Sequence, residues 1–255
     1  MSASPSADQV MGRLAFRSPF LLGGQAARRG LTCQACHGQG DVNSEFFVVG
    51  LSETPGTADV TSFHFSDVLG DESFNPVPIP SLSDDFEGVD FDPAKPDLEA
   101  FVTRLITKEF TGPVPSPQVK ASLLSYLRGL TEQPCETPRL QEADLLAYKL
   151  RVVDQSFAAL TAQDLPRDMF DFMTAALRVE LGRLHDRFPN NPDIQGELVA
   201  ISASMREGDQ AVSEIIMPAA NQWTVLSPRL GSAYEKSLFN PVIIREWEAA
   251  RRNRR

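Results

Sequence analysis

Three of the six cysteine and histidine residues of this 255-residue chain stand together, in the stretch Cys33-Gln34-Ala35-Cys36-His37. Side chains three positions apart are neighbours on one helical turn, so this spacing places both thiols on the same face with the imidazole next to them. With so few cysteines and histidines in the chain, this grouping is far from a chance event. These three side chains are therefore the first candidates for a functional site.

The C-x-x-C-H pattern is the signature of covalent c-type haem attachment. Its two thiols add to the two vinyl groups of one haem, and its histidine binds the iron as proximal ligand. The sequence thus predicts one covalent haem c, anchored by Cys33 and Cys36 and ligated by His37.

Two other interpretations use the same three residues. A zinc site needs about four ligands, and the other cysteines and histidines are His64, Cys135 and His185, none of which belongs to a second C-x-x-C pair. A thioredoxin-like redox dithiol needs a βαβ context, which the flanking sequence does not suggest. We therefore favour haem over both.

A polar stretch with two prolines at residues 131–138 predicts a linker. It divides the chain into a haem domain at residues 1–132 and a helical domain at residues 139–255. Residues 1–132 carry a net charge of −8 and residues 133–255 a net charge of −2. Cys135 lies in the linker and is interpreted as an incidental thiol.

In the first domain, hydrophobic spacing predicts three helices separated by long loops. The first begins at Ser18 and Pro19, a cap followed by a first-turn proline, and ends before Gly30. The other two are predicted near residues 97–110 and 116–130.

The second domain is predicted to be a helical bundle. Apolar stripes with steps of three and four residues run through residues 146–160, 170–188 and 194–205. Asn191-Pro192 and Ser227-Pro228 are predicted helix starts, because each pairs a capping side chain with a first-turn proline. Short connections between the stripes favour an antiparallel arrangement.

Part of the sequence resembles a known family. Residues 23–38 are similar to the first helix and haem motif of cytochrome c domains, most of all those of the di-haem cytochrome c peroxidase family. Residues 79–82, Ile-Pro-Ser-Leu, resemble the segment before the distal loop there, and residues 98–102 and 123–130 resemble the two later helices. The resemblance covers about residues 15–132 and implies an all-α, cytochrome c-like fold for the first domain.

The sequence also departs from that family. After the proline-serine-leucine segment the family supplies a methionine or histidine as distal ligand, whereas residues 83–90 contain neither. No methionine occurs between His37 and Leu130, and a single haem motif excludes an intramolecular two-haem mechanism. The sixth iron ligand is therefore predicted to be His64, which lies between two phenylalanines, or the position is open.

Four further side chains are weaker candidates for that ligand. They lie on or near apolar stripes of the second domain, where methionine is ordinary core filling. They are His185, Met173, Met205 and Met217.

These observations predict a mono-haem c-type cytochrome that transfers single electrons. The missing distal methionine supports an alternative, a haem-based small-ligand sensor or a peroxidase-like protein with an open distal site. The net charge of −10 argues against a nucleic-acid-binding protein. An acidic run at residues 84–92 is either a solvated loop or a surface that attracts basic redox partner proteins.

No apolar run is long enough to predict a transmembrane segment. Residues 1–10 lack the basic and apolar regions of a secretory signal. The family resemblance nevertheless implies haem attachment on the periplasmic side in bacteria. The chain is therefore predicted to be periplasmic, as a mature form or with a truncated start.

Overall fold

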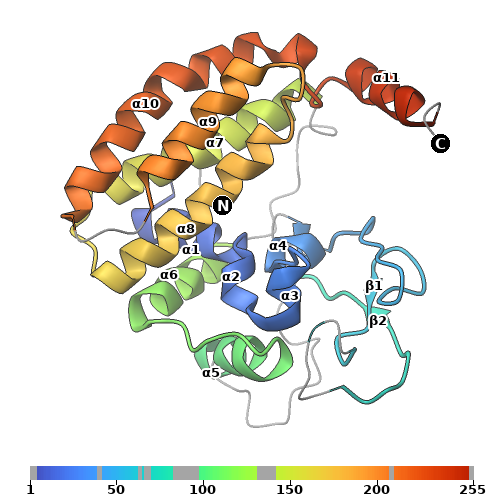
Figure 1. Ribbon diagram of the computed structural model, residues 1–255. Helices are drawn as coiled ribbons and strands as arrows, with labels where there is room; N and C mark the ends of the chain where they lie inside the picture. The colour runs from blue at the N-terminus through green and yellow to red at the C-terminus, as the bar shows by residue number, and fades with distance from the viewer. Residues whose placement is uncertain are drawn as a thin grey trace. The chain divides into compact units, whose positions relative to one another are not determined.

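The computed structural model describes residues 5–38, 42–62, 65, 70–82, 98–130, 142–206 and 210–252. The chain divides into two compact units, Met1–Gln133 and Pro134–Arg255. Helices make up most of the described residues (Figure 1), and the described part of the chain is therefore all-α. The predicted linker, residues 131–138, lies outside the described residues.

The first unit combines short helices with long connections. Its two strands, of two residues each, pair antiparallel with Thr57 opposite Pro78. Its elements are α1 (Ala7–Phe16), α2 (Pro19–Leu22), α3 (Gly24–Arg28), α4 (Cys33–Cys36), β1 (Thr57–Ala58), β2 (Val77–Pro78), α5 (Leu98–Arg104), the π-helix η3 (Leu105–Glu109) and α6 (Pro117–Arg128).

Helix α1 packs along α6 and gives the first unit much of its core. It begins with a capping box, in which the Ser6 hydroxyl accepts a hydrogen bond from the Gln9 amide at 3.2 Å and the Gln9 side chain accepts one from the Ser6 amide at 3.0 Å. A Cβ atom at Gly12 would collide with the Ser122 carbonyl oxygen of α6. The two helices therefore touch backbone to backbone. Sequence reasoning did not predict α1.

The helix predicted near residues 19–29 is interrupted in the structure. Its start is confirmed, since Ser18 accepts a hydrogen bond from the Phe20 amide at 3.3 Å. At Gly23 the backbone adopts φ 63°, which a right-handed helix cannot continue, and the chain divides into α2 and α3. A Cβ at Gly23 would lie 2.7 Å from the Cα of Gly112, so the glycine also permits a close approach of a distant segment.

The second unit is a bundle with one additional helix. In it α7 and α8, α8 and α9, α9 and α10, and α10 and α7 are in contact (Figure 1). Its elements are α7 (Glu142–Thr161), α8 (Arg167–His185), α9 (Pro192–Ser204), α10 (Val212–Ser232), the 3-10 helix η4 (Tyr234–Lys236) and α11 (Pro241–Arg252). The predicted helical bundle is present.

One predicted helix start is wrong and another is confirmed. Pro192 is the first residue of α9, as predicted. Ser227 and Pro228 instead lie inside α10, which runs through both. The Ser227 hydroxyl donates to a carboxylate oxygen of Asp154 in α7 at 3.4 Å instead of capping a helix. Buried leucines on either side hold α10 against the bundle, and this packing outweighs the hydrogen bond lost at the proline.

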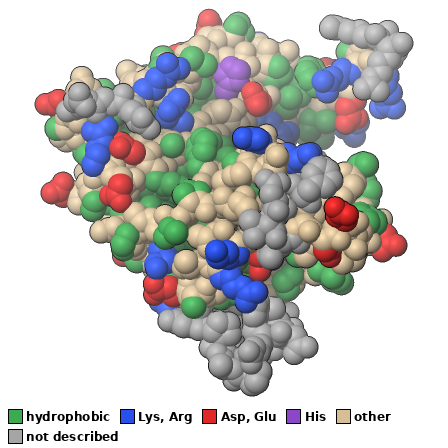
Figure 2. Space-filling model, turned by 60° about the horizontal axis from the view of Figure 1, so that its bottom comes forward, with side chains coloured by type: hydrophobic (Ala, Val, Ile, Leu, Met, Phe, Trp, Pro, Cys, Tyr) green, Lys and Arg blue, Asp and Glu red, His purple; other side chains and the backbone are tan. Residues whose placement is uncertain are grey.

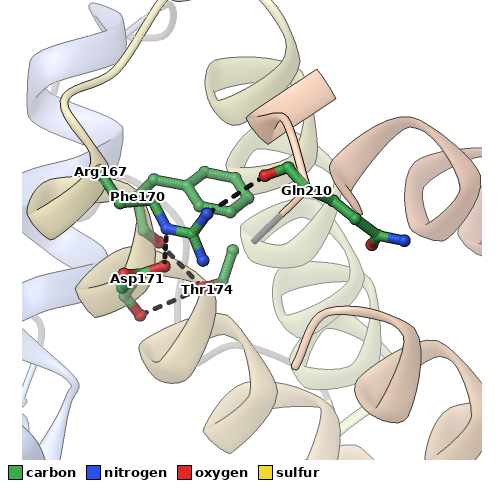
Figure 3. Close-up of polar contacts among 5 residues, drawn as sticks. All are labelled: Arg167, Phe170, Asp171, Thr174 and Gln210. Atoms are coloured by element: carbon green, nitrogen blue, oxygen red, sulfur yellow. Dashed lines mark hydrogen bonds and ion pairs between the residues drawn. The ribbon is translucent and has the colours of Figure 1, made fainter. Parts of the chain in front are cut away.

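A small polar cluster fixes the start of α8 (Figure 3). The Arg167 guanidinium contacts Asp171 at 2.8 Å and donates to the carbonyl oxygen of Gln210 at 3.2 Å. One turn further on, the Thr174 hydroxyl donates to the Phe170 carbonyl at 2.9 Å. The segment that leads into α10 is thereby attached to α8. Among the described helices, none has the length and apolar character required to cross a membrane.

Candidate functional site

The predicted site residues lie together on one capped turn. Helix α4 is this single turn, and it begins where the Thr32 hydroxyl accepts a hydrogen bond from the Ala35 amide at 3.2 Å. The amide of His37 donates to the Cys33 carbonyl at 2.8 Å and closes the turn. Cys33 and Cys36 thus share the turn, and His37 is its C-terminal cap.

The chain reaches this turn through a sharp reversal after α3. Gly30 has φ 70°, and the Leu31 amide donates back to the Ala26 carbonyl at 2.9 Å. This is the hydrogen bond of a Schellman motif, which favours glycine at the left-handed position. The predicted helix end at Gly30 is confirmed.

Asn43 holds the other end of the turn, and sequence reasoning missed it. Its backbone amide donates to the Cys36 carbonyl at 2.9 Å, and its side-chain amide donates to the Ala35 carbonyl at 2.8 Å. The last carbonyls of a helix have no partner within the helix, so these bonds satisfy groups that α4 itself leaves open. A lone asparagine in a loop forms no recognisable pattern with a motif that precedes it.

Two clusters of buried hydrophobic side chains lie against this turn. Cys33 packs against the first, called here the Cys33 cluster, and Cys36 against the second, the Cys36 cluster. Leu31 and Val48 contact both clusters. The Cys33 cluster consists of Leu22, Ala26, Leu51 and Phe65, and the Cys36 cluster of Phe46, Ala58 and Ile79. Each thiol therefore lies in an apolar environment.

That environment keeps both sulfur atoms uncharged. Burial raises the pKa of the Cys33 thiol to about 12, with a further contribution from the neighbouring Cys36. Burial also raises the pKa of the Cys36 thiol to about 12. A thiol with a raised pKa carries little thiolate at neutral pH, which disfavours a reactive redox dithiol at this turn.

His37 is half-buried, and its Nδ1 atom is fully buried. Within the part of the chain that the structure describes, no group of three or more His, Cys, Asp or Glu side chains is arranged to hold a metal ion. His37 and the two cysteines are neighbours along the turn.

The structure places the other predicted ligands in different ways. His64 lies outside the described residues, as do Cys135 and the acidic run at residues 84–92. Phe65, which follows His64 in sequence, belongs to the Cys33 cluster and packs edge-on against Phe110, with ring centroids 5.4 Å apart.

The candidates in the second unit have ordinary surroundings. Met173 and Met205 are buried in its core, as expected for core filling, and Met217 is exposed. His185 lies near the end of α8, where its Nδ1 atom is 3.0 Å from a carboxylate oxygen of the adjacent Asp186.

In the comparisons with known proteins, no family model, no curated protein and no solved structure matches this chain. The function is therefore inferred from the residues of the site.

Proposed function

We propose that this chain is a mono-haem c-type cytochrome that transfers single electrons. The observation that carries the proposal is the turn α4, which presents two thiols and an imidazole together and packs each thiol against an apolar cluster of its own. A flat group with a largely apolar ring, held at three points, fits these surroundings.

The three residues of the turn would hold the haem in two different ways. Cys33 and Cys36 would each add their sulfur across a vinyl group, forming a C–S bond while the thiol proton moves to the other vinyl carbon. His37 would supply a ring nitrogen to the iron, and because Nδ1 is buried, that nitrogen is Nε2. When bound, the haem supplies a one-electron couple between ferric and ferrous iron.

The proposal keeps the resemblance to cytochrome c domains of the di-haem peroxidase family. Ile79, from the Ile-Pro-Ser-Leu segment that resembles the family, lies in the Cys36 cluster. A segment distant in sequence from the motif thus contributes to the surroundings of one anchoring thiol.

We further propose a periplasmic location and a basic redox partner. The location follows from the chemistry of haem attachment that the family resemblance implies. The partner follows from the charge of −8 on residues 1–132, since a surface of one sign attracts a partner of the opposite sign and raises the rate of encounter.

The second candidate function is binding of a small ligand at an open iron position, as in a sensor or a peroxidase-like protein. The observation that favours it is the absence of methionine from the sequence between His37 and Leu130, which leaves His64 as the one soft ligand there. Addition of CO to the ferrous protein separates the candidates. A firmly six-coordinate haem resists CO, whereas an open site binds it and shifts the Soret band.

The test of the proposed function is an absorption spectrum of the chain exported to a periplasm that contains haem-maturation machinery. We expect haem that stays attached in a denaturing gel and a sharp, low-spin spectrum after reduction with dithionite. Cys33→Ser or Cys36→Ser should weaken the attachment to one thioether, and the double variant should abolish it.

The chain provides its own matched controls. Cys135→Ser removes the third thiol and His185→Ala removes a histidine of the second unit, and both variants should retain the wild-type spectrum. His64→Ala tests the distal position separately. A wild-type chain that acquires no covalent haem under these conditions is incompatible with the proposal.

A further inference from the structure

Helix α11 differs from the bundle helices of its unit because none of its residues is buried. It extends away from the bundle formed by α7 to α10 (Figure 1). Two of its large hydrophobic side chains are strongly exposed, Val242 at 49% and Trp247 at 40%. Such a helix gains little stability from its own unit, so its apolar side chains are available for another surface.

The side chains of α11 separate by type around its axis. Among the described helices of ten residues or more, it is the most strongly amphipathic. Helical periodicity places Ile243 and Trp247 on one face and Arg245, Glu248 and Arg252 on the opposite face. On the polar face, Arg252 lies 3.8 Å from Glu248.

The C-terminal segment, residues 245–255, is positively charged, whereas the chain as a whole is negatively charged. Residues 245–255 contain five arginines and two glutamates, whereas the whole chain has a net charge of −10. The Arg251 guanidinium lies over the Trp247 ring, 4.6 Å from its centroid, so a cation borders the apolar face. Figure 2 shows basic and hydrophobic side chains side by side in this region, at its upper right.

We infer that α11 binds the surface of a membrane that contains anionic lipid and attaches the protein there peripherally. A helix with arginines on its polar face and tryptophan and isoleucine on the other lies in the plane of the lipid headgroups. Tryptophan favours that depth, and anionic headgroups complement the arginines. This inference goes beyond the proposed function and does not depend on haem.

The experiment is sedimentation of the full-length protein with lipid vesicles. We expect binding to vesicles of phosphatidylcholine mixed with phosphatidylglycerol, weak or no binding to phosphatidylcholine alone, and release as salt is raised. A brominated lipid should quench the emission of Trp247, which the Trp247→Phe variant identifies by difference, because Trp223 is buried in the bundle.

Two variants test separately how the basic and the apolar side chains of α11 contribute to vesicle binding. Arg251→Gln with Arg252→Gln should lower the vesicle partition coefficient about fivefold per arginine removed. Trp247→Ala should lower it by about tenfold. All three side chains are exposed, so neither variant disturbs a core.

The matched controls remove side chains of the same kinds from other positions in the second unit. Arg206→Gln with Lys236→Gln removes two exposed cations, and Val225→Ala removes a hydrophobic side chain that is 68% exposed on α10. Both controls should bind vesicles as the wild type does.

Three results would overturn the inference. One is a failure of the wild type to bind anionic vesicles. The second is an equal loss of binding in the control variants, which would indicate attraction by net charge alone. The third is a self-associated protein that the α11 variants dissociate while no form binds vesicles, which would assign α11 to a second copy of the chain.

Discussion

Thr32 caps the turn that carries both thiols, and its side chain is buried. Replacement of an N-cap hydroxyl costs about 1 kcal/mol. We therefore predict that Thr32→Val destabilises α4 by that amount, whereas Thr32→Ser, which keeps the hydroxyl, does not. Amide hydrogen exchange at Ala35 and His37 in the haem-free protein should become about fivefold faster in the valine variant. Unchanged exchange would show that the turn is held without this cap.

The raised pKa values of the two half-buried thiols predict how the stability of the haem-free protein depends on pH. Their pKa is about 12 in the folded state, above the ordinary value of 9.0, so the folded state holds its thiol protons longer than the unfolded state does. This contribution is unchanged below pH 9 and is lost as pH rises from 9 towards 12. Urea midpoints across this range should fall more steeply for the wild type than for Cys33→Ala with Cys36→Ala. Other groups that titrate between pH 9 and 12 affect both proteins equally, so the difference between the two curves reports the thiols alone. Parallel curves would contradict the prediction.

The close contact between α1 and α6 can be tested by a substitution at Gly12. Gly12→Ala would place a methyl group against the Ser122 carbonyl, so we expect a loss of about 2 kcal/mol or more in the free energy of unfolding. Gly182→Ala in α8 is the matched control, because nothing lies within 4 Å of the added methyl group. That variant should be more stable by about 0.5–1 kcal/mol. Thermal unfolding followed by circular dichroism measures both, and equal midpoints would refute the close contact.

The elements that sequence reasoning predicted well are those whose signals are local. The starts of α6 and α9 follow from Ser116 and from Pro192, because a cap and a first-turn proline act within one turn. The break at Gly23 does have a local signal, the Gly23-Gly24 pair, which the predicted helix at residues 19–29 ignored. The passage of α10 through Pro228 depends on packing against other helices, and no local pattern predicts it.

The same division holds at the candidate site. The C-x-x-C-H motif and the stop at Gly30 were readable in the sequence, since each is a short pattern with a fixed geometric meaning. Asn43 and the two clusters were not, because they bring single side chains from distant loops to the turn. Phe65 and Ile79, for example, carry no mark in the sequence that links them to a particular thiol.

The division of the chain into two compact units predicts that residues 134–255 fold alone. Their core comes from their own helices, and within it the Trp223 indole donates to a carboxylate oxygen of Asp154 at 2.7 Å. The isolated fragment should show helical circular dichroism, cooperative thermal unfolding and the blue-shifted emission of a buried tryptophan. A fragment that is unfolded in isolation would show that the second unit needs the first.

The hydrogen bonds around α4 have a consequence for the order of folding. The bonds that define the turn and its entry come from Ala26, Thr32 and Asn43, close neighbours along the chain, so little loop entropy opposes their formation. The clusters against the thiols need Phe65 and Ile79, whose contacts close longer loops and form more slowly. The turn can therefore exist as a nascent structure with accessible sulfur atoms before its hydrophobic surroundings condense. A group that arrives in that interval would be enclosed as the domain completes its folding.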